Sequence, residues 1–136
     1  MRNTLITAIV SSVGNISNLG CSVLASWDNS RNPSAAQIVV SAKVSPVLQD
    51  AAGRACAWSA EVSVTAITHA GDDASGAVRK AASSKVWSWL MGLTPASITV
   101  TGYTVDAIME ESQDQTEPWG EEFVGEPVSF NLMISK

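Results

Sequence analysis

The chain has 136 residues, of which 46% are hydrophobic, and its formal net charge is −5. This length corresponds to one domain, residues 1–136, and the apolar content is typical of a globular rather than a disordered chain. Lys and Arg are absent from Val86 to Ser135, while eight carboxylates fall between Asp106 and Glu126. Such a surface repels phosphate, which disfavours a protein that wraps duplex DNA.

The N-terminal segment has superficial features of a secretory signal, because Arg2 precedes an apolar run from Leu5 to Val10. The run is short, polar residues follow it, and it falls far below the roughly 20 apolar residues that cross a membrane. We therefore predict a helix of the mature protein that stops near Gly20. Its apolar face consists of Leu5, Ile9, Val13 and Ile16.

Three strands are predicted next, over Cys21–Trp27, Gln37–Val44 and Ala57–Thr68. Asp28–Ser34 has the composition of a loop, and Pro46 is expected to end the second strand. The third strand alternates most clearly, with polar residues on one face, as in a half-buried antiparallel strand. Its apolar face consists of Trp58, Ala60, Val62, Val64 and Ala66.

A polar turn then leads into a second helix that is predicted to run to about Leu93, before Pro95. We expect Asp72 or Asp73 to cap this helix, since a carboxylate accepts the free N–H groups of a first turn and suits the helix dipole. Its core-facing residues are expected to be Ala74, Val78, Ala81 or Ala82, Val86 and Trp89 or Leu90. Its solvent-facing residues are expected to be Arg79, Lys80 and Lys85.

The β-branched residues of Ser97–Val105 predict a further strand, and the acidic stretch from Asp106 to Gly125 reads as a loop. Val128–Ser135 predicts a last strand that points Val128, Phe130, Leu132 and Ile134 inward. Helices and strands do not alternate along the chain. This order predicts an α+β fold, in which an antiparallel sheet carries the N-terminal and central helices on one face.

The only histidine, His69, lies beside Asp72 and Asp73, which raises the question of a metal site or a general base. One His and two adjacent acids are too few for a metal site, and no G-x-S-x-G nucleophile motif is present. We interpret the cluster as a turn followed by a helix cap. We expect neither enzymatic activity nor a cofactor.

Cys21 and Cys56 lack a CxxC spacing, so we expect reduced thiols and no zinc, although the sequence leaves a disulfide between them open.

The acidic stretch from Asp106 to Gly125 leaves three interpretations open. Its Glu110–Glu111 and Glu121–Glu122 pairs could serve glycoside hydrolysis, but no aromatic groove accompanies them. Calcium binding is the second interpretation, although the spacing does not match an EF-hand loop. A solvated loop is the third, and no metal is expected.

The basic strip on the second helix and the acidic stretch could meet between two copies of the chain. Such a contact is heterologous, and it closes into a ring where the rotation permits. The residues expected at this interface are Arg79, Lys80, Lys85, Glu117, Trp119, Glu121 and Glu122.

The order of elements resembles that of the tail-terminator, or tail-completion, proteins of tailed bacteriophages. The shared features are an N-terminal helix, an antiparallel sheet, and a strand that ends in an Asp-rich Thr-His turn before a helix, here from Val62 to Leu90. A further strand, an acidic hairpin-like excursion and a final alternating strand, Val128 to Ile134, complete the resemblance.

The resemblance implies a homo-oligomeric ring, a hexamer, that caps the tail tube and forms the head–tail joining interface of the virion. It implies the tail tube protein and head–neck connector proteins as partners, DNA that passes through without specific binding, and synthesis in the host cytoplasm. An acidic lumen or axial face would keep DNA from adhering. The residues expected there are Asp106, Glu110, Glu111 and Asp114.

Two other functions remain open. One is another virion component, such as a head-completion, decoration or baseplate protein. The other is an α+β domain that binds a small ligand or a peptide in a concave apolar pocket, lined by Trp87 and Trp89.

Overall fold

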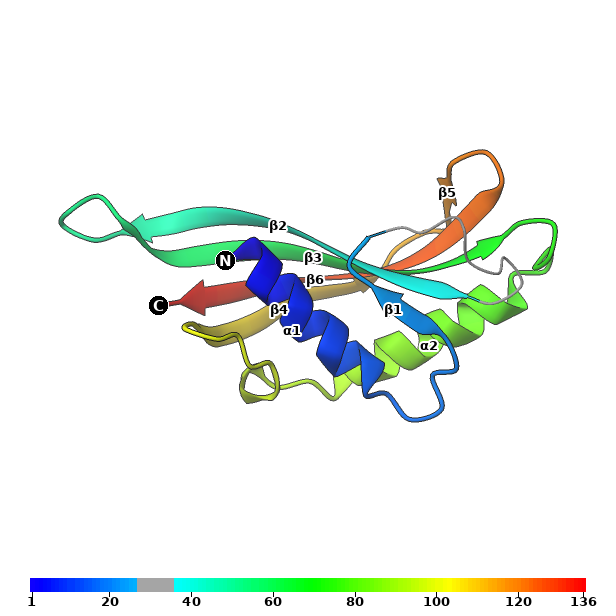
Figure 1. Cartoon of the computed structure of the whole chain (residues 1–136), viewed down its shortest axis with the longest axis horizontal. Helices are drawn as coiled ribbons and strands as arrows, with labels where there is room; N and C mark the ends of the chain where they lie inside the picture. Colours follow the sequence, from blue (N-terminus) through cyan, green and yellow to red (C-terminus); the bar gives the residue numbers. More distant parts are fainter. Residues whose placement is uncertain (27–35) are drawn as a thin grey trace.

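The computed structural model describes residues 1–26 and 36–136, and it has an α+β fold, which confirms the predicted fold class (Figure 1). The predicted loop Asp28–Ser34 and the last residue of the first predicted strand, Trp27, lie outside the described residues. The helices are α1 (Arg2–Gly14), α2 (Ala77–Met91) and a 3-10 turn, η1 (Pro95–Ser97). The strands are β1 (Ser22–Leu24), β2 (Gln37–Gln49), β3 (Ala55–His69), β4 (Thr104–Gln113), β5 (Glu117–Trp119) and β6 (Phe123–Ser135).

The six strands form one mixed sheet in the order β1-β2-β3-β6-β4, with β5 also paired to β6. β1 runs parallel to β2, and the other pairs are antiparallel. The long central pair is β3 with β6, whose register runs from Ala57 opposite Ser135 to His69 opposite Phe123. These two strands therefore connect the two ends of the molecule.

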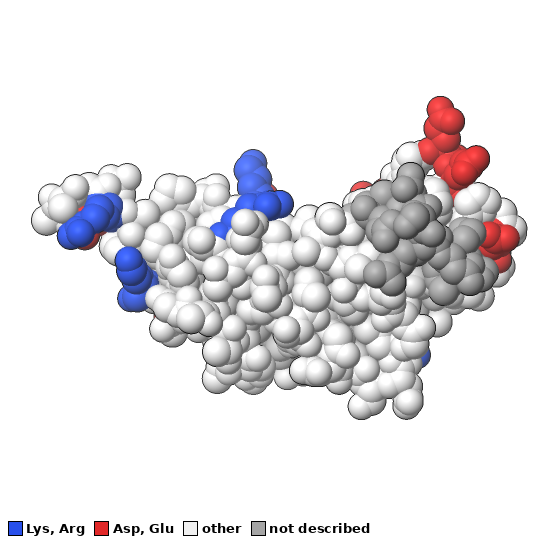
Figure 2. Space-filling view, in the orientation of Figure 1, with Lys and Arg blue, Asp and Glu red and all other residues white. Residues whose placement is uncertain are grey.

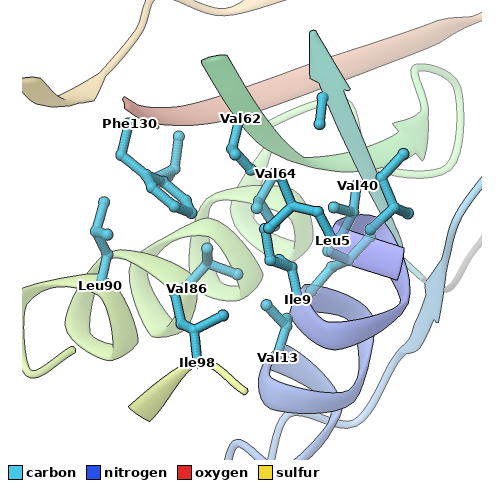
Figure 3. Packing of buried hydrophobic residues seen from close by; sticks show 14 of the residues in the cluster. Leu5, Ile9, Val13, Val40, Val62, Val64, Val86, Leu90, Ile98 and Phe130 are labelled. Atoms are coloured by element: carbon cyan, nitrogen blue, oxygen red, sulfur yellow. The ribbon is translucent and has the colours of Figure 1, made fainter. Parts of the chain in front are cut away.

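Both helices pack on the same face of the sheet (Figures 1 and 3). Every second side chain of β3 and β6 points toward this face. The predicted inward set of β6 is fully buried, with Val128, Leu132 and Ile134 at 0% exposure and Phe130 at 1%. Each such side chain contributes roughly 1.5–3 kcal/mol by leaving water. The core cluster joins both helices to the sheet through Leu5, Ile9, Val86, Leu90, Val62, Val64 and Phe130.

The other face of the sheet, which we call the open face, is polar over its middle part. The alternation of β2, β3 and β6 places Ser41, Lys43, Glu61, Ser63, Ser129 and Asn131 there, lining a shallow groove of about 540 Å³. Helices cover only one side of this sheet. Such a sheet has apolar side chains on the covered face and polar side chains on the solvent face.

The prediction that Pro46 ends a strand is wrong, because β2 continues to Gln49 and pairs Pro46 with Trp58. β1 covers only the first residues of β2, from Gln37 to Val39, so Pro46 lies on an edge. An edge strand tolerates proline, since the missing N–H is on the side that faces away from the sheet. The register does shift directly after it, between Pro46 and Leu48.

The predicted strand Ser97–Val105 and the acidic loop that should follow it are also misplaced. Thr94 and Ser97 bond to each other locally, with their hydroxyls 2.7 Å apart, and this favours the 3-10 turn η1 over an extended chain. The strand β4 begins at Thr104 and contains Asp106, Glu110 and Glu111. These carboxylates occupy the outer strand of the sheet, where charge discourages pairing with other chains.

The second helix also differs from the prediction at its ends and on its inner face. It begins at Ala77, so Ala74 precedes it, and it ends at Met91. Its buried residues are Arg79, Ala82, Val86 and Leu90, whereas Val78 is 42% exposed. Neither helix within residues 1–26 and 36–136 has the length and hydrophobicity that a membrane crossing demands.

Candidate functional site

The turn between β3 and α2 is organised by Asp73, which is 5% exposed. Its carboxylate accepts the N–H of Val78 at 3.1 Å, the N–H of Arg79 at 3.1 Å and the hydroxyl of Thr68 at 2.9 Å. Gly76 occupies the N-cap position itself with a φ of 76°. Asp73 thus supplies the capping acceptor from three residues earlier in the chain, in a geometry that the sequence did not reveal.

Burial works against the charged form of Asp73. The N–H groups of Val78 and Arg79, the hydroxyl of Thr68 and the positive charge of Arg79 outweigh it, so the pKa of Asp73 lies below its ordinary value. The carboxylate is therefore ionised at neutral pH, and it stabilises the start of α2 both as an acceptor and as a negative charge.

The prediction that Arg79 faces solvent is wrong, because Arg79 is only 9% exposed. Its Nη1 donates to the carbonyl of Asp73 at 3.2 Å, and its Nε donates to Oε1 of Glu126 at 3.1 Å. Glu126 also accepts the hydroxyl of Thr116 at 2.7 Å. A buried guanidinium needs such partners, and together they form a network that connects α2, β6 and the segment before β5.

His69 ends β3 and lies between two carboxylates, with Nδ1 3.5 Å from Asp72 and Nε2 3.8 Å from Glu122. Its Nδ1 accepts the N–H of Gly71 at 3.2 Å, and its ring meets Phe123 edge-on with centroids 5.4 Å apart. Asp72 therefore faces His69 and takes no part in capping α2. The contacts of His69 are those of a residue that holds a turn.

The acidic stretch is divided between two places in the structure. Asp106, Glu110 and Glu111 belong to β4, and Glu110 and Asp114 bond to the open face through Asn131 and Ser129. The remaining predicted interface acids lie on β5 and in the turn to β6: Glu117, Glu121 and Glu122, with Trp119. This second group lies at the end of the sheet where α2 begins, since the carbonyl of Glu122 accepts the N–H of Ala70 at 2.8 Å.

The predicted interface residues that point outward therefore gather at one end of the molecule. We call this end, formed by the turns 70–76 and 120–122 and the first turns of α2, the acidic end. Lys80 is exposed there, and the Nζ of Lys85 donates to the carbonyl of Asn18. The opposite end is the hairpin of β2 and β3, where Arg54 is exposed. Figure 2 shows most of the visible Lys and Arg side chains near this hairpin and at mid-length, and most of the visible carboxylates at the acidic end, while Asp50 pairs with Arg54 at the hairpin tip.

The prediction that Trp87 and Trp89 line one pocket is wrong, because Trp89 borders an open depression of about 460 Å³ whose lining does not include Trp87. Trp89 also packs between the helices and the sheet. Its Nε1 donates to the hydroxyl of Ser12 at 3.0 Å, and its ring contacts Phe130 with centroids 5.9 Å apart. A larger cleft of about 590 Å³ lies between α1 and residues 97–101, and its lining is uncharged. Small-molecule sites are mostly apolar with a few converging polar groups, and this lining is mainly Ser, Thr and Asn.

Metal and thiol chemistry have little basis in the described part of the chain, which contains no group of three His, Cys, Asp or Glu side chains placed to bind a metal. Cys21 and Cys56 are both free. Burial raises the pKa of the Cys21 thiol, and the nearby positive charge of Lys85 opposes this only in part. The Cys21 thiol is thus protonated at neutral pH, which makes it a poor nucleophile.

Comparison of the sequence with protein-family models finds no match, and neither does comparison with curated proteins. The function is therefore inferred from the geometry of this molecule and from the resemblance in the order of its elements.

Proposed function

We propose that this protein is a structural subunit that assembles with copies of itself into a ring in a phage tail or neck. In this role it caps the tail tube and presents a surface to the head–neck connector, and the finished ring belongs to the virion. The number of subunits implied by the resemblance is six. The partners proposed with it are the tail tube protein, the connector proteins and, without specific binding, the DNA that passes through.

The observation that carries this proposal is the separation of charge along the long axis. The hairpin end carries Arg54, whose side chain is 80% exposed and lies 3.3 Å from Asp50, and the exposed Lys136 beside Cys56. Asp72, Glu121 and Glu122 lie at the acidic end. Opposite charges at opposite ends favour head-to-tail contacts between identical copies, and such contacts are the heterologous kind that builds rings.

The open face supports the same role. It combines hydroxyl and amide groups with the carboxylates of Glu61, Glu110 and Asp114, which outnumber Lys43, the one cation among the groove residues. A surface of this kind repels the phosphates of DNA, as the lining of a conduit must. We therefore keep Glu110 and Asp114, with Asp106 and Glu111 on the same strand, as the proposed lumen or axial residues.

The first test is native mass spectrometry with negative-stain imaging of the purified chain over a range of protein and salt concentrations. We expect a closed ring with a central hole, whose population falls as salt screens the contacts between charged ends. A monomer at every concentration and salt level would contradict self-assembly. A two-fold symmetric dimer that does not grow would contradict the head-to-tail arrangement.

Charge reversal tests which ends meet. Arg54→Glu should weaken assembly, and Glu122→Lys in the same chain should partly restore it, because each contact then again joins opposite charges. Arg79 is left unchanged in this test, since it is buried within its own subunit. Equal assembly of Arg54→Glu and the unmodified chain would rule out the hairpin end as a charged contact surface.

A further inference from the structure

The hairpin of β2 and β3 extends as an arm beyond the helices (Figure 1). It carries exposed apolar side chains near its tip. Val47 is 52% exposed and Leu48 is 60% exposed, in the part of β2 where the register with β3 shifts. Aliphatic side chains displayed in this way gain free energy when a partner covers them.

The tip of the arm is held in one shape. One carboxylate oxygen of Asp50 accepts the N–H groups of Ala52 and Arg54, each at 2.9 Å, and the N–H of Asp50 donates to the carbonyl of Arg54 at 2.8 Å. A tip that is ordered before it meets a partner loses little conformational entropy on docking. The arm therefore has the properties of a preformed binding element.

An apolar cleft of about 400 Å³ lies at the other end of the molecule, between the start of α2 and the segment that joins α1 to β1. We call it the end cleft. Its lining is mainly aliphatic, and it includes Val78, which is 42% exposed although it belongs to a helix. The lining residues are Leu19, Gly20, Cys21, Ala36, Ala77, Val78, Ala81, Ala82 and Lys85.

Four large hydrophobic side chains are exposed within residues 1–26 and 36–136, namely Val47, Leu48, Val78 and Met91. The first two are on the arm and the third lines the end cleft.

The arm cannot reach the end cleft of its own chain. Ala36, in the cleft, precedes Gln37, which pairs with Ile67 of β3, whereas the tip lies beside Ala57. A strand rises about 3.3 Å per residue, so these two points on β3 are roughly 30 Å apart. Contact between arm and cleft therefore requires a second copy of the chain.

We infer that the arm of one subunit docks in the end cleft of the next, so that Leu48 and Val47 cover Val78 and its apolar neighbours. The inference rests on the proposed self-assembly and gives it a specific interface. Charges of both signs are present on each side of this contact. The tip carries the Asp50–Arg54 ion pair, at 3.3 Å, and the cleft carries Lys85 and adjoins the acidic end with its carboxylates. A knob and a complementary cleft on different parts of one chain make a heterologous contact, which repeats around a ring.

The native cysteines allow a direct test, since Cys21 lines the end cleft and Cys56 lies next to the tip, with its thiol 3.6 Å from the carbonyl of Leu48. A short bis-maleimide, applied at about pH 8.5 because the raised pKa of the Cys21 thiol slows its reaction at neutral pH, should convert the assembled chain into a covalent ladder of oligomers. Cys21→Ser and Cys56→Ser should each give no covalent dimer alone. An equimolar mixture of the two variants should give a dimer and nothing larger, because each subunit then carries a single thiol.

A substitution test uses Leu48→Ser, with Met91→Ser as the matched control at an exposed aliphatic residue outside both places. We expect Leu48→Ser to weaken assembly about 30-fold, as removal of a central interface anchor does, and Met91→Ser to assemble like the parent chain. Circular dichroism of both variants establishes that they remain folded.

The outcomes separate the two proposals. If the parent chain forms rings but gives no Cys21–Cys56 product, and Leu48→Ser assembles normally, the arm-in-cleft contact is wrong while the ring remains. A covalent dimer of Cys21→Ser would show that the arms meet each other, which also overturns this contact. If the parent chain stays monomeric under all conditions, both proposals fall.

Discussion

Arg79 contacts Asp73 through both its backbone and its side chain. The backbone N–H of Arg79 lies 3.1 Å from Oδ2 of Asp73, and its Nη1 lies 3.2 Å from the carbonyl oxygen and 3.7 Å from the same carboxylate oxygen. The two residues are buried, and Glu126 completes the neutralisation of the guanidinium from β6. The start of α2 is thus attached to the centre of the sheet by charge as well as by the apolar core.

The capping role of Asp73 makes stability depend on acid. Because its folded-state pKa lies below the unfolded value of 3.8, the unfolded chain binds the proton first as pH falls. The ionised Asp73 carboxylate stabilises the folded state fully above about pH 5. This stabilisation disappears as the pH falls through the folded-state pKa of Asp73. We expect Asp73→Asn to lower the free energy of unfolding by about 2 kcal/mol at pH 7 and to flatten the acid limb of the stability curve.

Urea denaturation between pH 2.5 and pH 7 measures both effects. Asp72→Asn is the matched control, since the Asp72 carboxylate lies on the surface beside His69 and accepts no bond from α2. It should retain the acid limb of the parent chain. Parallel stability curves for Asp73→Asn and the parent chain would mean that the Asp73 carboxylate contributes nothing specific.

The contrast between two neighbouring cations provides a second prediction. Arg79→Glu should destabilise the fold by about 3–5 kcal/mol, because it places a third carboxylate beside Asp73 and Glu126 in a buried position. Lys80→Glu, one residue further on the exposed side of the helix, should change stability by no more than about 0.5 kcal/mol. Thermal unfolding of both variants is sufficient, and similar losses for the two would contradict the burial of Arg79.

Strands in which apolar and polar residues strictly alternate could be predicted from the sequence. Most of β3 and the end of β6 were predicted in this way. The reason is local: side chains alternate every second residue, so Val128 to Ile134 fixes its own inward face. Pro46 and β4 could not be predicted in the same way. Whether a proline is tolerated, or a charged segment becomes a strand, depends on which strand forms the edge of the sheet, and that order is set by distant parts of the chain.

The buried network shows the same limit for the candidate site. Glu126 is 47 residues from Arg79, so no local pattern connects them. A signal for the burial of Arg79 did exist, because it shares the helix spacing of Ala82, Val86 and Leu90, the buried residues of α2. The positive charge of Arg79 obscures this signal, because arginine side chains are mostly exposed. The arm and the end cleft left no such signal, since exposure is a property of the folded molecule.

Gly125 provides a third prediction, based on packing rather than charge. A Cβ added at this buried position would lie 2.7 Å from Cγ2 of Thr65, which is 3% exposed on the facing strand. We expect Gly125→Ala to cost about 2 kcal/mol of stability through overpacking. Thr65→Ser removes the obstructing methyl group, so the double variant should be more stable than the sum of the single losses indicates. Additive losses in chemical denaturation would mean that the two sites do not touch.

Replacement of the only histidine, His69, tests whether its imidazole does more than hold its turn. His69→Ala removes the acceptor for the N–H of Gly71 and the edge contact with Phe123, on a side chain that is 29% exposed. Losses of this kind amount to about 1 kcal/mol, because the freed N–H can bond to water. The variant should therefore unfold at slightly lower urea concentration and still assemble as the parent chain does. His69→Gln, which keeps a hydrogen-bond acceptor, should recover part of the lost stability. If His69→Ala abolished assembly while the chain stayed folded, the imidazole would have to act at a subunit contact, because its bonds within the subunit are too weak to account for such a loss.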